Sequence, residues 1–206
     1  KEVLLNLFLP LGFICALIFP ANFSTAALVF ITGMTLLFLG GVYLKHIAAF
    51  VGSVVLMGTL AITLALTVPA VQQAFPRAQT WVNRIENFSG DKSENSDIFY
   101  QVTQAKIAVV NGGVKGRGPG KSIQRNTLPH PYSDYIYAII VEEYGLIGGL
   151  FVLGLYLTFL FRGKRIFNLA NDSYGAYLGI GLTVSLVLQA LINMAVAVDL
   201  FPVTGQ

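Results

Sequence analysis

The stretch YIYAIIVEEYGLIGGLFVLGLYLTFLF, residues 135–161, decides the fold class of this chain. Apart from the adjacent Glu142 and Glu143, it carries no charged residue. A helix rising 1.5 Å per residue and of this length can cross a hydrocarbon core about 30 Å thick. We therefore predict a transmembrane helix whose carboxylates face protein or a water-filled cavity, because a charge at that depth costs about 2.5–3.5 kcal/mol on insertion scales.

Four more apolar segments repeat this pattern elsewhere in the 206 residues. They are Val3–Phe19, Ser24–Leu44, Ile47–Ala70 and Tyr174–Val198. The chain is 55% hydrophobic and only 11% charged, whereas soluble domains carry about 25% charged residues. We predict an all-α polytopic membrane protein with five transmembrane helices, in which Ser24 can serve as the N-cap of the second helix. The net charge of +3 is small and dispersed, and gives no indication of nucleic-acid binding.

Basic residues indicate how these helices are oriented. Those placed between or beside the apolar segments are Lys45, His46, Arg162, Lys164 and Arg165. By the positive-inside rule, links that carry such residues face the cytoplasm. The chain then divides into three transmembrane helices in 1–70, a large extracytoplasmic loop in 71–134, and two transmembrane helices with the start of the next outer loop in 135–206.

Inside the large loop, Ile98–Val110 has the periodicity of an amphipathic helix. Its apolar face consists of Ile98, Val102, Ala105 and Val109. Ser96 and Asp97 are possible caps, and Asn111-Gly112-Gly113 is a stop signal. We expect this helix to lie against the membrane domain.

The residues that follow this helix are rich in glycine and cationic. The cations are Lys115, Arg117, Lys121 and Arg125, interleaved with glycines 112, 113, 116, 118 and 120. A Walker A phosphate loop would need glycine where the chain has Lys115, so nucleotide binding is disfavoured. Two interpretations stay open, a flexible basic loop or a cradle in which freed backbone N–H groups and the cations bind an anion such as a diphosphate.

Carboxylates near and inside the fourth apolar segment are candidate functional groups. Asp134, at the junction of loop and apolar run, is either a helix N-cap shared with Ser133 or a general base towards a hydroxyl of a lipid-linked substrate. Glu142 and Glu143 belong either to a structural ion pair or to a functional cavity.

Arg77 and Arg84 flank Trp81 just beyond the third apolar segment, where they either anchor the span or contribute to a site. The single cysteine, Cys15, lies in an apolar run and is expected to be buried. His130 has no second histidine or cysteine nearby, so we predict no metal site of the His/Cys kind.

Taken together, these residues resemble the FtsW/RodA/SpoVE (SEDS) family, and most closely its division-type FtsW branch. The matching elements are Pro20 to Thr25, Arg77 through Trp81 to Arg84, Tyr100-Gln101 with Gln104, Gly112 to Gln124, Leu128-Pro129, Ser133-Asp134-Tyr135, Glu142-Glu143 with Gly145, and Pro202 to Gly205. They run in family order across the whole chain, which then looks like spans five to nine of about ten. His130 stands where the family commonly has glutamate.

The resemblance implies a peptidoglycan glycosyltransferase of the bacterial cytoplasmic membrane that polymerises lipid II, a disaccharide peptide linked to undecaprenyl diphosphate. Asp134 would deprotonate or orient the attacking sugar hydroxyl, and Arg77 would offset diphosphate charge. The other residues expected to bind substrate are Arg84, Gln101, Lys115, Lys121, Glu142 and Glu143. A divalent cation, Mg²⁺ or Mn²⁺, could share the charge, although no cluster of acids establishes it.

The expected partners are a class B penicillin-binding protein, which cross-links the new strands, and other proteins of the division septum. Two alternatives to the polymerase stay open, a lipid II flippase and a non-catalytic scaffold of the division complex. A flippase would depend on ionisable groups near mid-membrane, at Glu142 and Glu143, whereas a polymerase needs Asp134 at the outer face.

Overall fold

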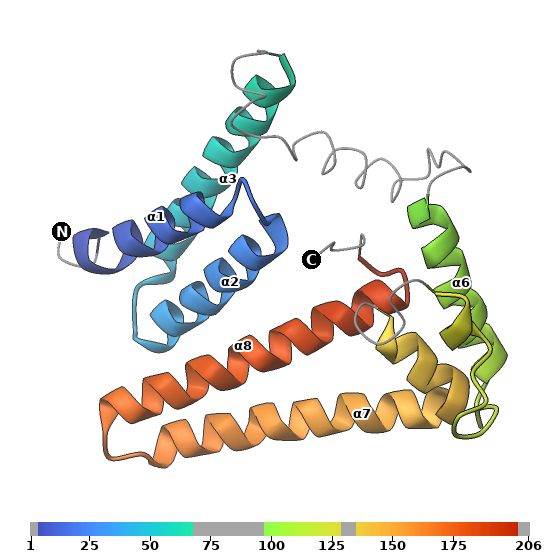
Figure 1. Ribbon diagram of the computed structural model, residues 1–206. Coiled ribbons are helices and arrows are strands. Elements are labelled where there is room, and N and C mark those ends of the chain that lie inside the picture. The colour runs from blue at the N-terminus through green and yellow to red at the C-terminus, as the bar shows by residue number, and fades with distance from the viewer. Residues whose placement is uncertain (1–3, 68–96, 129–134, 202–206) are drawn as a thin grey trace. The chain divides into compact units, whose positions relative to one another are not determined.

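The computed structural model describes residues 4–67, 97–128 and 135–201, and the regular structure in these ranges is entirely helical. A π-helix, Leu4–Phe8, leads into α1 (Leu9–Ile18), which is followed by α2 (Phe23–Leu39) and α3 (Leu44–Thr67). Next come α6 (Asp97–Gly112), a short 3₁₀ helix η2 (Gln124–Asn126), α7 (Ile136–Leu169) and α8 (Ser173–Ala197) (Figure 1). The all-α prediction is confirmed for the described residues.

Three of the described helices are long and apolar enough to cross a membrane. They are Leu44–Leu64 within α3, the whole of α7 and the whole of α8. The first two of the five expected spans are shorter apolar helices, Asn6–Ile18 and Phe23–Leu39. Helix α2 ends early because the Gly40-Gly41 turn, with Gly41 at φ 78°, stops it. Its 17 residues extend over about 26 Å.

The cap of α2 differs from the expectation. Asn22, not Ser24, is the N-cap, because its extended backbone lets its side chain accept a hydrogen bond from Thr25 N at 3.2 Å. Ser24 already lies inside the first turn of the helix. The prediction that Ser24 caps this helix is therefore wrong.

The basic residues expected in the links between spans lie instead within helices. Lys45 and His46 belong to the first turn of α3, and residues 162–165 continue α7, which ends only at Leu169. Lysine and arginine are good helix formers, so they do not interrupt a helix as glycine or proline would. The turns themselves are residues 40–43 and 170–172.

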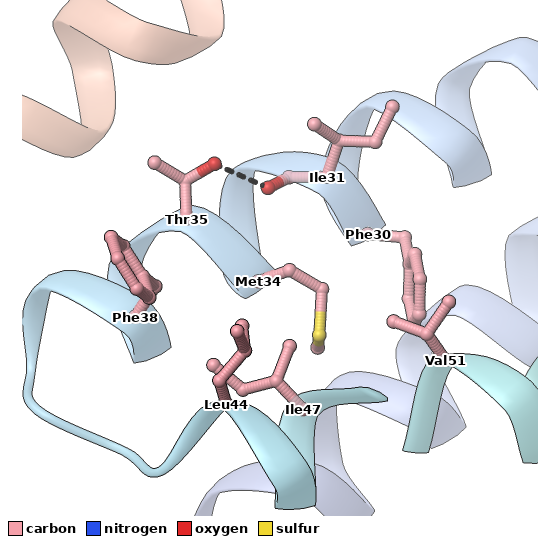
Figure 2. Close-up of a pocket in the computed structure, with 8 residues that line it drawn as sticks. All are labelled: Phe30, Ile31, Met34, Thr35, Phe38, Leu44, Ile47 and Val51. Atoms are coloured by element: carbon pink, nitrogen blue, oxygen red, sulfur yellow. Dashed lines mark hydrogen bonds between the residues drawn. The ribbon is translucent and has the colours of Figure 1, made fainter. Parts of the chain in front are cut away.

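The described residues form two compact units. The first contains residues 4–67 and 170–185, and its core cluster is Phe8, Met34, Leu37 and Ile47. Cys15 is buried, as expected, with its thiol 3.7 Å from the carbonyl oxygen of Ala26. An open apolar groove of about 370 Å³ lies between α2 and α3, bordered by Met34, Ile47 and Val51 among others (Figure 2). None of the described residues that line this groove is charged.

The second unit contains residues 97–128, 135–169 and 186–201. Its core cluster is Ala105, Ala108, Leu128, Tyr135, Ala138 and Ala197, with Val109 packed against it. Ala105 and Val109 confirm the predicted apolar face of α6. The helix also stops as predicted, with Gly113 at φ 52° immediately after Gly112. Lys106 of α6 forms an ion pair with Asp199, two residues beyond α8.

Candidate functional site

Helix α7 is broken at Gly145, which has φ 72° and ψ −174°. In a continuous helix, Leu146 N would donate to Glu142 O and Ile147 N to Glu143 O. The break separates these groups, and unpaired backbone groups in an apolar environment cost several kcal/mol each. The chain must therefore supply other partners at this point.

The glycine-rich segment that follows α6, residues 113–125 and called the loop below, supplies those partners. Its residues Gly113–Gly118 lie along the break (Figure 1). Two loop N–H groups and two loop carbonyls there replace the lost helical bonds. The four hydrogen bonds are Arg117 N to Glu142 O (3.0 Å), Gly118 N to Glu143 O (2.9 Å), Leu146 N to Gly113 O (2.9 Å) and Ile147 N to Val114 O (3.5 Å).

Two glycines, Gly112 and Gly116, make this close approach possible. A Cβ on Gly112 would lie 2.9 Å from Cα of Glu142, and one on Gly116 would lie 2.5 Å from the nitrogen of Gly145. Real Cβ atoms essentially never come within 3.0 Å of another residue's backbone. Because both neighbours are backbone atoms, a side-chain rotation cannot relieve the clash. The glycines are therefore required where the loop meets α7.

The Glu142 side chain makes a second attachment between loop and helix. Glu142 is 0% exposed, and its carboxylate accepts hydrogen bonds from Ser122 Oγ, from Ile123 N (3.3 Å) and from Gln124 N (3.3 Å). It therefore acts on the start of η2 as an acidic cap does on a helix N-terminus. Among the described residues the one ion pair is Lys106–Asp199. Glu142 is thus satisfied by hydrogen bonds and not by a described cation.

The cations of the loop point to anion binding. Lys115, Arg117 and Lys121 are exposed and Arg125 is half-buried. Within the described residues, none of the four pairs with a carboxylate. Four cations within eleven residues, none of which has a described carboxylate partner, are of the side-chain types that bind anionic groups such as a phosphate or diphosphate.

The backbone of the loop contributes less to such a site than a glycine cradle would. Gly116 N donates to Gly112 O at 2.8 Å, and the N–H groups of Arg117 and Gly118 donate to α7. These amides hold the loop in place and are not available to a ligand. Anion recognition at this loop would therefore depend mainly on its lysine and arginine side chains.

The structure places the predicted substrate-binding residues unevenly. Gln101 is half-buried on α6, Glu143 is half-buried beside the break, and Lys115 and Lys121 are exposed on the loop. Asp134, Arg77 and Arg84 lie outside the described residues. Tyr135, which follows Asp134 in the chain, is fully buried in the core cluster of the second unit.

Metal binding finds no support in the described part of the chain. No group of three or more histidine, cysteine, aspartate or glutamate side chains gathers within residues 4–67, 97–128 and 135–201. The hypothesis of a divalent cation therefore rests on the resemblance alone.

Sequence reasoning missed the partners of Glu142. Ser122 is 7% exposed, and its hydroxyl donates to Glu142 while accepting a hydrogen bond from Arg125 N at 3.1 Å. Gln124 is equally buried, and its Oε1 has no hydrogen-bond partner within the described residues. No local signal in the sequence indicates these partners, because Ser122 lies twenty positions before Glu142 in the chain.

The match to a known protein family extends over the whole chain. Residues 1–206 match the model of the FtsW/RodA/SpoVE family, described as cell cycle proteins. The probable peptidoglycan glycosyltransferase FtsW of Hydrogenovibrio crunogenus is 36% identical over 214 aligned positions, covering 99% of this chain and 50% of that protein. The probable peptidoglycan glycosyltransferase FtsW of Halothiobacillus neapolitanus is 38% identical, covering 75% of this chain and 36% of that protein.

A sporulation protein is similar as well. Stage V sporulation protein E of Bacillus subtilis is 33% identical over 175 residues, which cover 84% of this chain and 44% of that protein. The chain therefore spans at most half the length of these three relatives. Because the family model matches every residue of it, the chain belongs to the FtsW/RodA/SpoVE family.

Proposed function

We propose that this chain forms part of a peptidoglycan glycosyltransferase that polymerises lipid II into glycan strands. The family match over residues 1–206 and the names of two similar proteins support this proposal. The structural observation that carries it is the loop of 113–125, whose four cations have no carboxylate partner among the described residues. Such a loop suits a substrate whose leaving group is a diphosphate.

In the proposed reaction, the 4-hydroxyl of a sugar on one lipid-linked molecule attacks the anomeric carbon of another with inversion. Asp134 accepts the hydroxyl proton, a new glycosidic bond forms, and the bond to the polyprenyl diphosphate breaks. Arg77, Arg84, Lys115 and Lys121 stabilise the charge that gathers on the departing diphosphate. Mg²⁺ or Mn²⁺ could share this task, and Gln101 and Glu143 would line the substrate cavity.

The proposed topology has five membrane helices, with the large loop and the Asp199 end outside the cytoplasm. The ion pair between Lys106 and Asp199 supports this arrangement, because it joins a residue of the large loop, residues 71–134, to the residues after α8. In the first unit, Tyr177 Oη lies 3.5 Å from Leu39 O, which supports placing the links after α2 and α7 on one side. The protein would lie in the cytoplasmic membrane at the division septum, with a class B penicillin-binding protein and other division proteins as partners.

The flippase alternative relies on membrane carboxylates that can bind or release a proton or an ion during transport. Both oxygens of Glu142 already accept hydrogen bonds from the loop. This arrangement favours a structural role for Glu142 and leaves Glu143 as the transporter candidate. The scaffold alternative predicts that Asp134 is dispensable.

The deciding experiment is glycan-strand synthesis from purified lipid II by the whole protein, reconstituted with its penicillin-binding protein. We expect long strands from the wild type and none from an Asp134→Ala variant that folds normally. A Glu143→Gln variant that loses lipid II transport while strand synthesis persists would favour the flippase. Equal strand synthesis by wild type and Asp134→Ala would overturn the assignment of Asp134 as the base.

A further inference from the structure

The loop is attached to α7 at two separate places. The four backbone bonds at the helix break hold residues 113–118, and the Glu142 carboxylate holds residues 122–124. No hydrogen bond to α7 holds the three residues between them, Pro119, Gly120 and Lys121. The position of Lys121 therefore depends on both attachments.

The second attachment extends beyond the residues that Glu142 contacts. Ser122 Oγ donates to the carboxylate and accepts from Arg125 N, so its hydroxyl connects Glu142 to the backbone of Arg125. Lys121 N also donates to Gly118 O at 3.2 Å, which closes a turn between the two attachments. One buried carboxylate thus fixes the backbone on both sides of Ser122, where two of the four loop cations lie.

Glu142 itself has no surface through which to touch a ligand. It is fully buried, and the donors of its three hydrogen bonds all belong to the loop. A buried carboxylate is costly to desolvate, and that cost is offset only while its donors stay in place. Its negative charge therefore favours the docked loop over any arrangement in which the loop has moved away.

We propose that Glu142 is a positioning residue for anion recognition, which acts through Ser122 and the start of η2 to hold Lys121 and Arg125 where they bind a lipid-linked diphosphate. The proposal deepens the proposed function and rests on it for the identity of the anion. The positioning itself rests on the hydrogen bonds and burial described above. Loss of the carboxylate should leave the first attachment, at residues 113–118, intact.

Two measurements on the whole protein in detergent test this role. Hydrogen–deuterium exchange reports the attachment of the loop, and equilibrium binding of a polyprenyl diphosphate reports anion recognition, with the uncharged prenol as reference. For Glu142→Ala we expect at least tenfold faster exchange in residues 121–125, little change in residues 113–118, and at least tenfold weaker diphosphate binding. Glu142→Gln, which keeps the shape and a carbonyl acceptor, should recover much of both losses.

Glu143→Ala is the matched control for exchange, because it removes the same charge one residue away without touching Ser122, Ile123 or Gln124. It should leave exchange in 121–125 unchanged. If Glu142→Ala fails to fold, Ser122→Ala removes one loop donor and leaves the sequence of α7 intact. It should give smaller changes in exchange and affinity in the same direction.

Two results would overturn the proposal. One is unchanged exchange in residues 121–125 when the carboxylate is removed, and the other is a loosened loop that still binds the diphosphate within twofold of wild type. A different result would contradict the proposed function without contradicting the role of Glu142. A wild-type protein that binds the diphosphate but makes no strands would remove the polymerase assignment and leave the positioning role of Glu142 standing.

Discussion

Gly116 and Gly145 face each other so closely that neither has room for a side chain. A Cβ on Gly116 would lie 2.5 Å from the nitrogen of Gly145, and a Cβ on Gly145 would lie 2.5 Å from the nitrogen of Gly116. Both residues also have positive φ, 78° and 72° respectively, which residues with a side chain adopt only at a cost of about 1–3 kcal/mol. The two glycines thus define the contact between the loop and the break in α7.

Alanine at Gly116 should therefore be far more damaging than alanine at Gly120. Gly120 has a similar φ of 72°, but a Cβ there would meet nothing within 4 Å. We expect Gly120→Ala to cost about 1–3 kcal/mol of stability from backbone conformation alone. Gly116→Ala should cost several kcal/mol more, because the loop must leave the break and expose its backbone groups.

Thermal unfolding of the two variants in detergent, beside wild type, measures this difference. Exchange in residues 113–118 should rise for Gly116→Ala and stay near wild type for Gly120→Ala. Equal destabilisation of the two variants would mean that positive φ, and not the close approach to α7, determines the need for glycine.

Asn22 and Ser24 provide a second matched pair. Asn22 accepts the hydrogen bond from Thr25 N, so Asn22→Ala should destabilise the start of α2 by about 1 kcal/mol. Ser24→Ala should change stability by less than about 0.5 kcal/mol, since Ser24 is not the cap of the helix and substitutions away from such features are usually nearly neutral. Unfolding of both variants by denaturant in mixed micelles compares them, and a larger loss for Ser24→Ala would contradict the assignment of the cap.

The ion pair of Lys106 and Asp199 should contribute little to stability. The side chain of Lys106 is 48% exposed, so water screens the pair, and exposed ion pairs typically contribute about 0.2–1 kcal/mol. A double-mutant cycle with Lys106→Ala and Asp199→Ala should give a coupling energy in that range, and lower at high salt. A coupling above about 2 kcal/mol would indicate a contact much less exposed to water than the one described.

Neutralising the exposed loop cations should weaken substrate binding. We expect the double variant Lys115→Ala, Lys121→Ala to raise the KM for lipid II by about tenfold, because each lost charge removes attraction to the diphosphate. Lys164→Ala, a cation near the end of α7, should leave the KM unchanged. Steady-state kinetics at two salt concentrations test this, and an unchanged KM in the double variant would exclude the loop from substrate recognition.

The helices could be predicted because each depends on residues close together in the chain. The apolar runs of α3, α7 and α8 and the glycine stop of α6 are local signals, and all four are present in the structure. The cap of α2 was predicted at Ser24, but an asparagine side chain two residues earlier can cap a helix equally well. The backbone of Asn22, at φ −151° and ψ 98°, decides it.

The break in α7 could not be predicted from such local signals. Gly145 interrupts an apolar run that otherwise reads as one helix, and its backbone partners lie in residues 113–118, about thirty positions earlier in the chain. The role of Glu142 could not be predicted for the same reason, because its partner Ser122 is distant in the sequence. Its carboxylate could be expected to have a partner, but nothing near it in the sequence indicates that the partner is Ser122. The identity of the base remains a prediction, since Asp134 lies outside the described residues.

The break in α7 affects how the protein is made, because the loop that completes it comes earlier in the chain. The loop is made before α7, yet its partners on α7 exist only after residues 142–147 have been added and inserted. Until the loop docks, four backbone groups of α7 are without their final partners, at several kcal/mol for each group left in lipid. Insertion of α7 is therefore completed only when a segment synthesised before it docks against the break.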